Sequence, residues 1–310
     1  MRLRYLISAA FFFCPSLFAD YAWIQEFEKL SLRTGFDVST TSRNYDHNGF
    51  SSNPTFNSQL VSLQDLTFWA EPEYGIAQDW SVGLRLGFLS GTAASLTSGL
   101  AVAQGASLAD TRANLKWRLS KEPLWTAEMY FKFPTGVAAP RSTTDIVVGE
   151  GNLDVGVKFH YGLQQKNLFF SVSPGLLARF AGYASAATLD AAAQIFIARA
   201  YGKIFVSSIF SFSPTALPPS DITSQSLGGT VGSYARLAAS PTLVTAGASF
   251  GVLLSRKFRF EIGVSKTVWG QRAPDFLAVT FNLLGLFDFA KPDLRPKIRE
   301  VPFEDAPADS

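Results

Sequence analysis

Histidine is the side chain best suited to acid–base chemistry near neutral pH, and this sequence contains only two. His47 lies among Asp, Asn and Gly residues in a run that is typical of a turn. His160 lies in a strand-like segment close to Asp154, but no motif places any of the many serines against it. A hydrolase built on a Ser–His–acid group is therefore the least favoured of the functions considered.

Signals for cofactor and metal binding are missing from the sequence. Gly149-x-Gly151 is not followed by Lys-Ser/Thr and opens no helical pattern, so it does not read as a phosphate-binding loop. His, Cys and acidic residues show no paired spacing of the kind that metal ligands have. We therefore expect no catalytic, cofactor-binding or metal-binding residues.

Charged residues are instead spaced so that they form one face of a series of strands. From Asp110 to Leu119 every second residue is polar or charged, and Asn114 and Leu115 illustrate the two faces. This period of two predicts a β-strand. The segments 124–133 and 152–161 repeat the alternation. Strands of about ten residues with one apolar and one charged face are typical of a transmembrane β-barrel.

The charged faces of these strands are predicted to line the lumen of the barrel. Two interpretations remain open, namely an interior filled by salt bridges and a narrow polar path. Later strands carry small residues such as Ser171, Ser173 and Gly175 at inward positions, so we expect one charged wall and one smooth wall. The predicted lumen-lining residues are Arg85, Arg112, Asn114, Lys116, Arg118, Glu128, Lys132, Asp154, Lys158 and His160.

The predicted fold is all-β, an antiparallel outer-membrane barrel of about twelve strands, which is the even number expected of bacterial barrels. Short connections alternate with longer ones rich in Gly, Ser, Thr and Pro, so the short side is expected to face the periplasm. Trp80, Trp117 and Trp125 fall near strand ends on that side, where aromatic rings favour the headgroup layer.

Composition and the N-terminus indicate an exported protein. Residues 1–19 read as a signal peptide, with Arg2 and Arg4 before an apolar run and a cleavage site after Ala19. Removing them takes away two bases and no acid, which leaves bases and acids equal in number and argues against a nucleic-acid partner. We expect a bacterial outer-membrane location, with membrane lipid and the barrel assembly machinery as partners.

The remaining chain divides into three parts. Residues 20–30 carry apolar side chains at helical spacing and are expected to form an N-terminal periplasmic segment, either an interfacial helix or a plug. Residues 31–289 form the predicted transmembrane barrel. Residues 290–310 are rich in proline and mixed charge, so they are expected to be a disordered periplasmic tail.

One predicted outer loop, Ser90 to Ser107, carries apolar residues and no charge. Leu96, Leu100 and Val102 are candidates for admitting an apolar solute, because apolar clusters on a surface often mark binding sites. The alternative is that this loop seals the barrel or contacts a second subunit, so a homo-oligomer is left open.

Two local patterns resemble a known family. The segment 73–84 resembles the strand, Tyr-Gly-Ile turn and strand of the outer-membrane family named for the MetA pathway of phenol degradation. The Pro-Thr-Gly of 134–136 followed by Gly-x-Gly-x-x-Asp at 149–154 is also similar to that family, which is related in type to long-chain fatty-acid channels. Membership would imply a barrel that takes up aromatic or other apolar compounds.

The favoured function is therefore an outer-membrane channel or uptake barrel for small hydrophobic or aromatic molecules. The competing interpretation is a closed structural or lipid-organising barrel without transport. An outer-membrane hydrolase ranks third. Sequence alone leaves the substrate and the opening of the lumen undetermined.

Overall fold

A computed structural model provides the structure of this chain. It describes residues 24–45, 48–53, 55–56, 59–135, 153–180, 183–212, 242–255, 257–271 and 273–288. Within those ranges no helix has both the length and the apolar character needed to cross a membrane. The predicted signal peptide, the whole predicted C-terminal tail and His47 lie outside the described residues.

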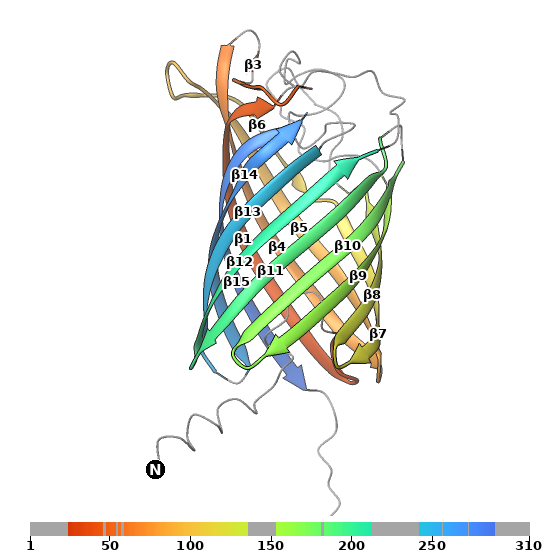
Figure 1. Cartoon of the computed structure of the whole chain (residues 1–310). Helices are drawn as coiled ribbons and strands as arrows, with labels where there is room; N and C mark the ends of the chain where they lie inside the picture. Colours follow the sequence, from red (N-terminus) through yellow and green to blue (C-terminus); the bar gives the residue numbers. More distant parts are fainter. Residues whose placement is uncertain are drawn as a thin grey trace, which may run out of the picture.

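Twelve long antiparallel strands of the described chain form a closed barrel (Figure 1). The barrel closes because β1 pairs with β15 on one side and with β4 on the other. Three shorter strands, β2 (Ser51–Ser52), β3 (Thr55–Phe56) and β6 (Ala101–Leu108), lie outside the ring of twelve. The ring consists of β1 (Lys29–Tyr45), β4 (Gln59–Ala77), β5 (Trp80–Ser95), β7 (Thr111–Lys121), β8 (Leu124–Phe133), β9 (Asp154–Gln165), β10 (Leu168–Arg179), β11 (Ala186–Ile197), β12 (Ala200–Ser211), β13 (Thr242–Leu253), β14 (Phe258–Gln271) and β15 (Ala273–Asp288).

The two faces of each strand differ as the alternation predicts. On β7, Asn114 and Lys116 are buried in the interior, whereas Trp117 is 44% exposed on the outside. On β8, Glu128 is buried and Met129 is exposed. Backbone N–H and C=O groups pair between neighbouring strands around the whole ring, which is the condition for crossing a bilayer with strands. The prediction of a twelve-stranded all-β barrel is thus confirmed. On β7 and β8 the charged residues face the interior and the apolar residues face outward, as the alternation predicts.

An arginine placed on the outer face should destabilise the barrel far more than one placed beside it on the inner face. Val172 of β10 is 41% exposed on the outside, and its neighbour Ser171 lines the interior cavity. Val172→Arg should cost about 2–4 kcal/mol if it lies near the bilayer midplane. Ser171→Arg should be tolerated, because its head group reaches a polar lumen.

Urea unfolding in lipid vesicles, followed by the gel mobility shift between folded and unfolded barrel, measures both variants. Equal losses for Val172→Arg and Ser171→Arg would contradict the assignment of the two faces.

Two aromatic pairs lie near one end of the barrel. The Trp80 and Trp117 rings stack with their centroids 5.4 Å apart, and the Trp125 and Tyr161 rings are 4.9 Å apart. At the same end, Arg118 Nε and Nη2 donate to Asp79 Oδ1 at 2.9 and 2.8 Å. Arg118, predicted to line the lumen, thus anchors the β4–β5 turn at the rim.

The expected outer loop Ser90 to Ser107 is for the most part a hairpin. β5 continues to Ser95 and β6 begins at Ala101, so only residues 96–100 form the turn between them. The pairing runs from Phe88 opposite Leu108 to Ala94 opposite Ala101. Figure 1 shows β6 and β3 at the end of the barrel away from the short turns. The small residues of this segment show no alternation of apolar and polar side chains, so the sequence does not indicate a strand. The strands form because pairing satisfies the backbone N–H and C=O groups.

Two other expected loops are also shorter than predicted. The loop 41–65 is reduced because β1 continues to Tyr45 and β4 begins at Gln59. The loop 268–275 shrinks to a single residue between β14, which ends at Gln271, and β15, which begins at Ala273. Strand ends that project beyond the barrel rim do not face lipid and therefore need no apolar face. Without the apolar alternation, their sequences resemble loops.

The described part of the N-terminal segment is not helical. Residues 24–28 fold back along the inner face of β4, with Phe27 bridged to Gly75 and Glu28 at φ 60°. Ile24 is 2% exposed, and the Gln25 N–H donates to Glu73 Oε1 at 3.1 Å. A Cβ on Gly75 would lie 2.0 Å from the Glu26 carbonyl oxygen. Only glycine at that position lets the two backbones approach this closely.

Candidate functional site: the interior cavity

The barrel encloses a cavity of about 420 Å³, to which every one of the twelve strands contributes side chains. Its volume falls in the range of small-molecule binding sites, roughly 300–1,000 Å³. The lining mixes charged residues with aromatic rings, including Trp69, Phe169 and Phe205. Such a wall can contact both an apolar ring and a polar group of the same solute.

Salt bridges on the part of the wall formed by β4 to β8 join adjacent strands or strands separated by one other strand. Arg112 Nη2 lies 2.5 Å from Glu128 Oε1, and Lys116 Nζ lies 2.7 Å from Glu73 Oε2. Glu73 Oε1 also accepts a hydrogen bond from Ser81 Oγ at 2.7 Å. In a buried site these pairs hold one another in a fixed geometry, because an isolated buried charge would be costly.

His160 connects three strands of the wall. Its Nε2 lies 2.8 Å from Glu128 Oε2, and its Nδ1 lies 2.8 Å from Ser173 Oγ. This is the Ser–His–acid row for which the sequence offered no motif, because the three residues are brought together only by strand pairing. Glu128, His160 and Ser173 are all less than 5% exposed, and the other Glu128 oxygen binds Arg112. The row therefore acts as a hydrogen-bonded brace of the wall, with little room for an acyl substrate at the histidine.

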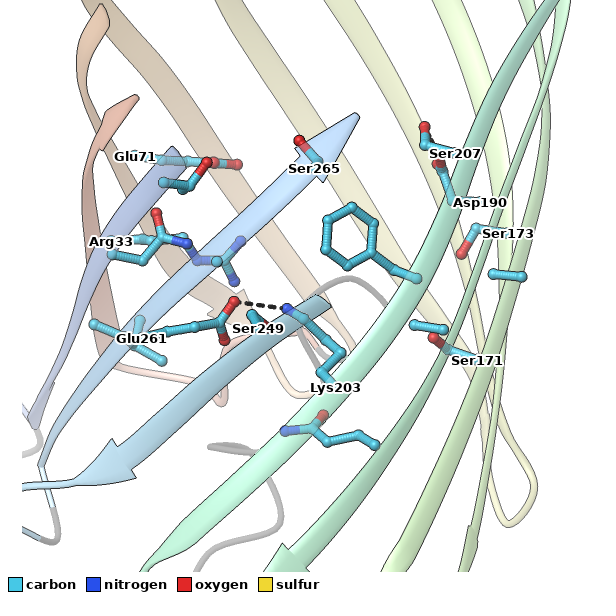
Figure 2. A pocket seen from close by; sticks show the side chains of 18 of the residues that line it. Arg33, Glu71, Ser171, Ser173, Asp190, Lys203, Ser207, Ser249, Glu261 and Ser265 are labelled. Atoms are coloured by element: carbon cyan, nitrogen blue, oxygen red, sulfur yellow. Dashed lines mark hydrogen bonds and ion pairs between the residues drawn. The ribbon is translucent and has the colours of Figure 1, made fainter. Parts of the chain in front are cut away.

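The opposite wall, expected to be smooth, is also charged. Lys203 Nζ lies 2.8 Å from Glu261 Oε1, the pair joined by the dashed line in Figure 2. Lys158 Nζ lies 2.6 Å from Asp190 Oδ2, and Ser207 Oγ donates to Asp190 Oδ1 at 2.5 Å. The expectation of a smooth wall is wrong.

Sequence reasoning missed the charges on this wall because apolar and charged residues share the inward face of β12. Tyr201, Lys203, Phe205 and Ser207 all point inward there. Ser207 lines the cavity, and counting back every second residue from it places Phe205 and Lys203 on the same inward face.

The predicted lumen residues divide into three groups. Lys132 and Asp154 form a 2.7 Å ion pair beside the cavity, and His160 lies buried in the wall. Arg118 lies at the rim. The predicted residues that do line the cavity are Arg85, Arg112, Asn114, Lys116, Glu128 and Lys158.

The candidate solute-admitting residues lie apart from the cavity. Leu96 and Leu100, in the turn between β5 and β6, are 44% and 70% exposed, and Val102 follows in β6. Within the described residues none of the three is part of the cavity wall. Their part in admitting a solute stays a prediction.

Arg85 differs from the other cations of the wall. Its guanidinium carbon lies 4.3 Å above the centre of the Trp69 ring, and Trp69 Nε1 donates to Asp37 Oδ2 at 2.8 Å. Arg85 and Arg112 face each other directly in the β5–β7 ladder. Two like charges in that position repel each other, so an arrangement of this kind calls for a compensating anion.

Metal binding finds no support in the described ranges. No group of three or more His, Cys, Asp or Glu side chains there is placed so that it could hold a metal ion.

Comparison with known proteins establishes the fold. The sequence matches none of the family models and none of the curated proteins with which it was compared. Among solved structures, an outer membrane channel from Pseudomonas putida F1 has a TM-score of 0.63 at 11% identity, over 87% of this chain and 99% of that chain. The protein thus has the fold of a bacterial outer-membrane barrel.

Weaker likenesses extend to other outer-membrane barrels. The CymD monoaromatic hydrocarbon channel has a TM-score of 0.44 at 11% identity, over 85% of this chain and 90% of that chain. The β domain of the Bordetella autotransporter BrkA has a TM-score of 0.48 at 8% identity, over 84% and 100% of the two chains.

Proposed function

We propose that this protein is a bacterial outer-membrane channel for the uptake of small hydrophobic or aromatic molecules. The observation that carries the proposal is the 420 Å³ cavity inside a barrel with an apolar outer face. The similar barrel from Pseudomonas putida F1 is itself an outer membrane channel. The local resemblance of residues 73–84 and 131–154 to the phenol-degradation family agrees with this reading.

The proposed orientation places the short turns and the N-terminal segment at the periplasmic end. The projecting β5–β6 hairpin, with Leu96 and Leu100 at its tip, then faces the outside of the cell. A solute would pass this hairpin before it reached the charged and aromatic wall. Rings such as Trp69 and Phe205 suit a planar solute, while the surrounding charges suit a polar substituent on it.

The competing proposal is a closed barrel with a structural role. It draws support from the salt bridges across the wall and from Ile24 and Gln25, which are buried against β4. A hydrolase has less support, because the Ser173–His160–Glu128 row is buried. No one of these features by itself prevents a small solute from occupying the cavity.

Bilayer recordings test the channel. Purified protein should conduct ions in planar lipid bilayers, and an aromatic solute such as phenol should reduce the current by occupying the cavity. Liposomes that contain the protein should take up small polar aromatic solutes faster than empty liposomes. Absence of both conductance and accelerated uptake, for protein that shows the folded barrel's gel mobility, would favour the closed structural role.

A further inference from the structure

Arg85 is a lumen cation that forms no ion pair with a carboxylate of the described residues. The described residues give it the Trp69 ring as a contact and no ion pair. It is half-buried and lines the cavity. A guanidinium stacked on a ring keeps its in-plane N–H donors free, and those donors match the two oxygens of a carboxylate.

The charges of the cavity favour an anion. Seven cationic and five carboxylate side chains line it. Glu73, which lies outside this lining, pairs with Lys116. Cations therefore outnumber carboxylates among the described lining residues. Glu71 is the carboxylate near Arg85. Its negative charge also interacts with Arg33, Lys116 and Arg112, so it is not available to Arg85 alone.

Arg112 provides a second donor beside Arg85. Its Nη2 is held by Glu128, and its guanidinium carbon lies 3.9 Å above the centre of the Tyr130 ring. Its Nε is buried and has no hydrogen-bond partner among the described residues. Arg85 and Arg112 thus lie opposite each other, each stacked on a ring, and both side chains line the same cavity.

We propose that Arg85, stacked on Trp69 and facing Arg112, binds the carboxylate of a small aromatic monocarboxylate inside the barrel. The inference rests on the proposed uptake function and specifies its substrate class. The excess of cations over carboxylates in the lining suits an anionic ligand. The ring of the ligand lies against the aromatic part of the wall, and its carboxylate compensates the two facing guanidinium groups.

Calorimetric titration of the detergent-purified protein tests the proposal without requiring transport. Benzoate is the probe, and benzyl alcohol is its neutral counterpart of similar shape. Benzoate should bind with one site per chain and at least tenfold more tightly than benzyl alcohol. Arg85→Gln should weaken benzoate binding at least tenfold, because the charge-assisted hydrogen bonds to the carboxylate are lost, and should leave benzyl alcohol binding unchanged.

Arg118→Gln is the matched control, because it makes the same change at the rim, where Arg118 binds Asp79. It should leave benzoate affinity within twofold of the original. Arg85→Lys, which keeps the charge and loses the planar fork, is the second variant and should bind benzoate with intermediate affinity. Gel mobility reports whether each variant is folded.

Equal affinity for benzoate and benzyl alcohol, or an unchanged affinity in folded Arg85→Gln, would overturn the proposal. Benzoate binding without any conductance or uptake would leave the proposal standing and remove the channel function. Conductance and uptake without benzoate binding would overturn the carboxylate site and leave the channel function standing.

Discussion

Glu128→Gln is expected to destabilise the barrel by about 3–5 kcal/mol, because removing one partner strands the other charges in a buried site. Glu128 is 2% exposed and contacts both Arg112 and His160. Glutamine keeps the size of the side chain but removes the negative charge, so the change isolates electrostatics from packing. Urea unfolding followed by gel mobility measures the loss.

Asp79→Asn is the control for this measurement. Asp79→Asn likewise removes the negative charge beside an arginine, Arg118. The Asp79 side chain, however, is 43% exposed. Water reaches the Asp79 side, and Arg118 also donates to the Gln78 carbonyl oxygen, so less stability should be lost than in Glu128→Gln. If Glu128→Gln costs as little as Asp79→Asn, water in the lumen must solvate Arg112 well. That outcome would contradict a tightly braced wall and indicate a wide, wet bore.

Gly75→Ala is expected to displace the N-terminal segment and to raise the ion conductance of the barrel severalfold. The added Cβ would lie 2.0 Å from the Glu26 carbonyl oxygen, which belongs to backbone and cannot rotate away. Residues 24–28 must therefore leave the inner face of β4. Because Ile24 and Gln25 occupy space inside the barrel, their departure should widen the bore at that end.

A labelling experiment reports the same displacement directly. The sequence has a single cysteine, Cys14, in the predicted signal peptide, so Ile24→Cys would add a unique thiol to the mature chain. A membrane-impermeant maleimide should label it slowly, since Ile24 is 2% exposed, and much faster when Gly75→Ala is also present.

Gly202→Ala is the matched control, because its Cβ would meet nothing closer than Ile195 Cγ2 at 3.8 Å. Its conductance should stay at the original level. Unchanged conductance together with slow labelling in Gly75→Ala would mean that the segment does not restrict the lumen.

The sequence by itself determined the class of fold and the two faces of its strands. Lipid on one side and a polar lumen on the other impose a strict period of two, so Asn114 and Leu115 could be assigned to opposite faces from local order alone. The same alternation placed Arg112, Lys116 and Glu128 on the inner face, where they line the cavity. These assignments depend only on neighbouring residues, which is why a single sequence was enough.

Only the tertiary structure decided which side chains meet. Glu128, His160 and Ser173 come together because β8, β9 and β10 pair in one register, and sequence spacing does not encode that register. The hairpin of β5 and β6 forms because strand pairing satisfies backbone groups of small residues that have no apolar alternation. The N-terminal residues could fold back only where Gly75 leaves space for another backbone. Pairing across strands and close backbone approach are long-range properties, and they determine the charge pattern in which Arg85 is left facing the cavity.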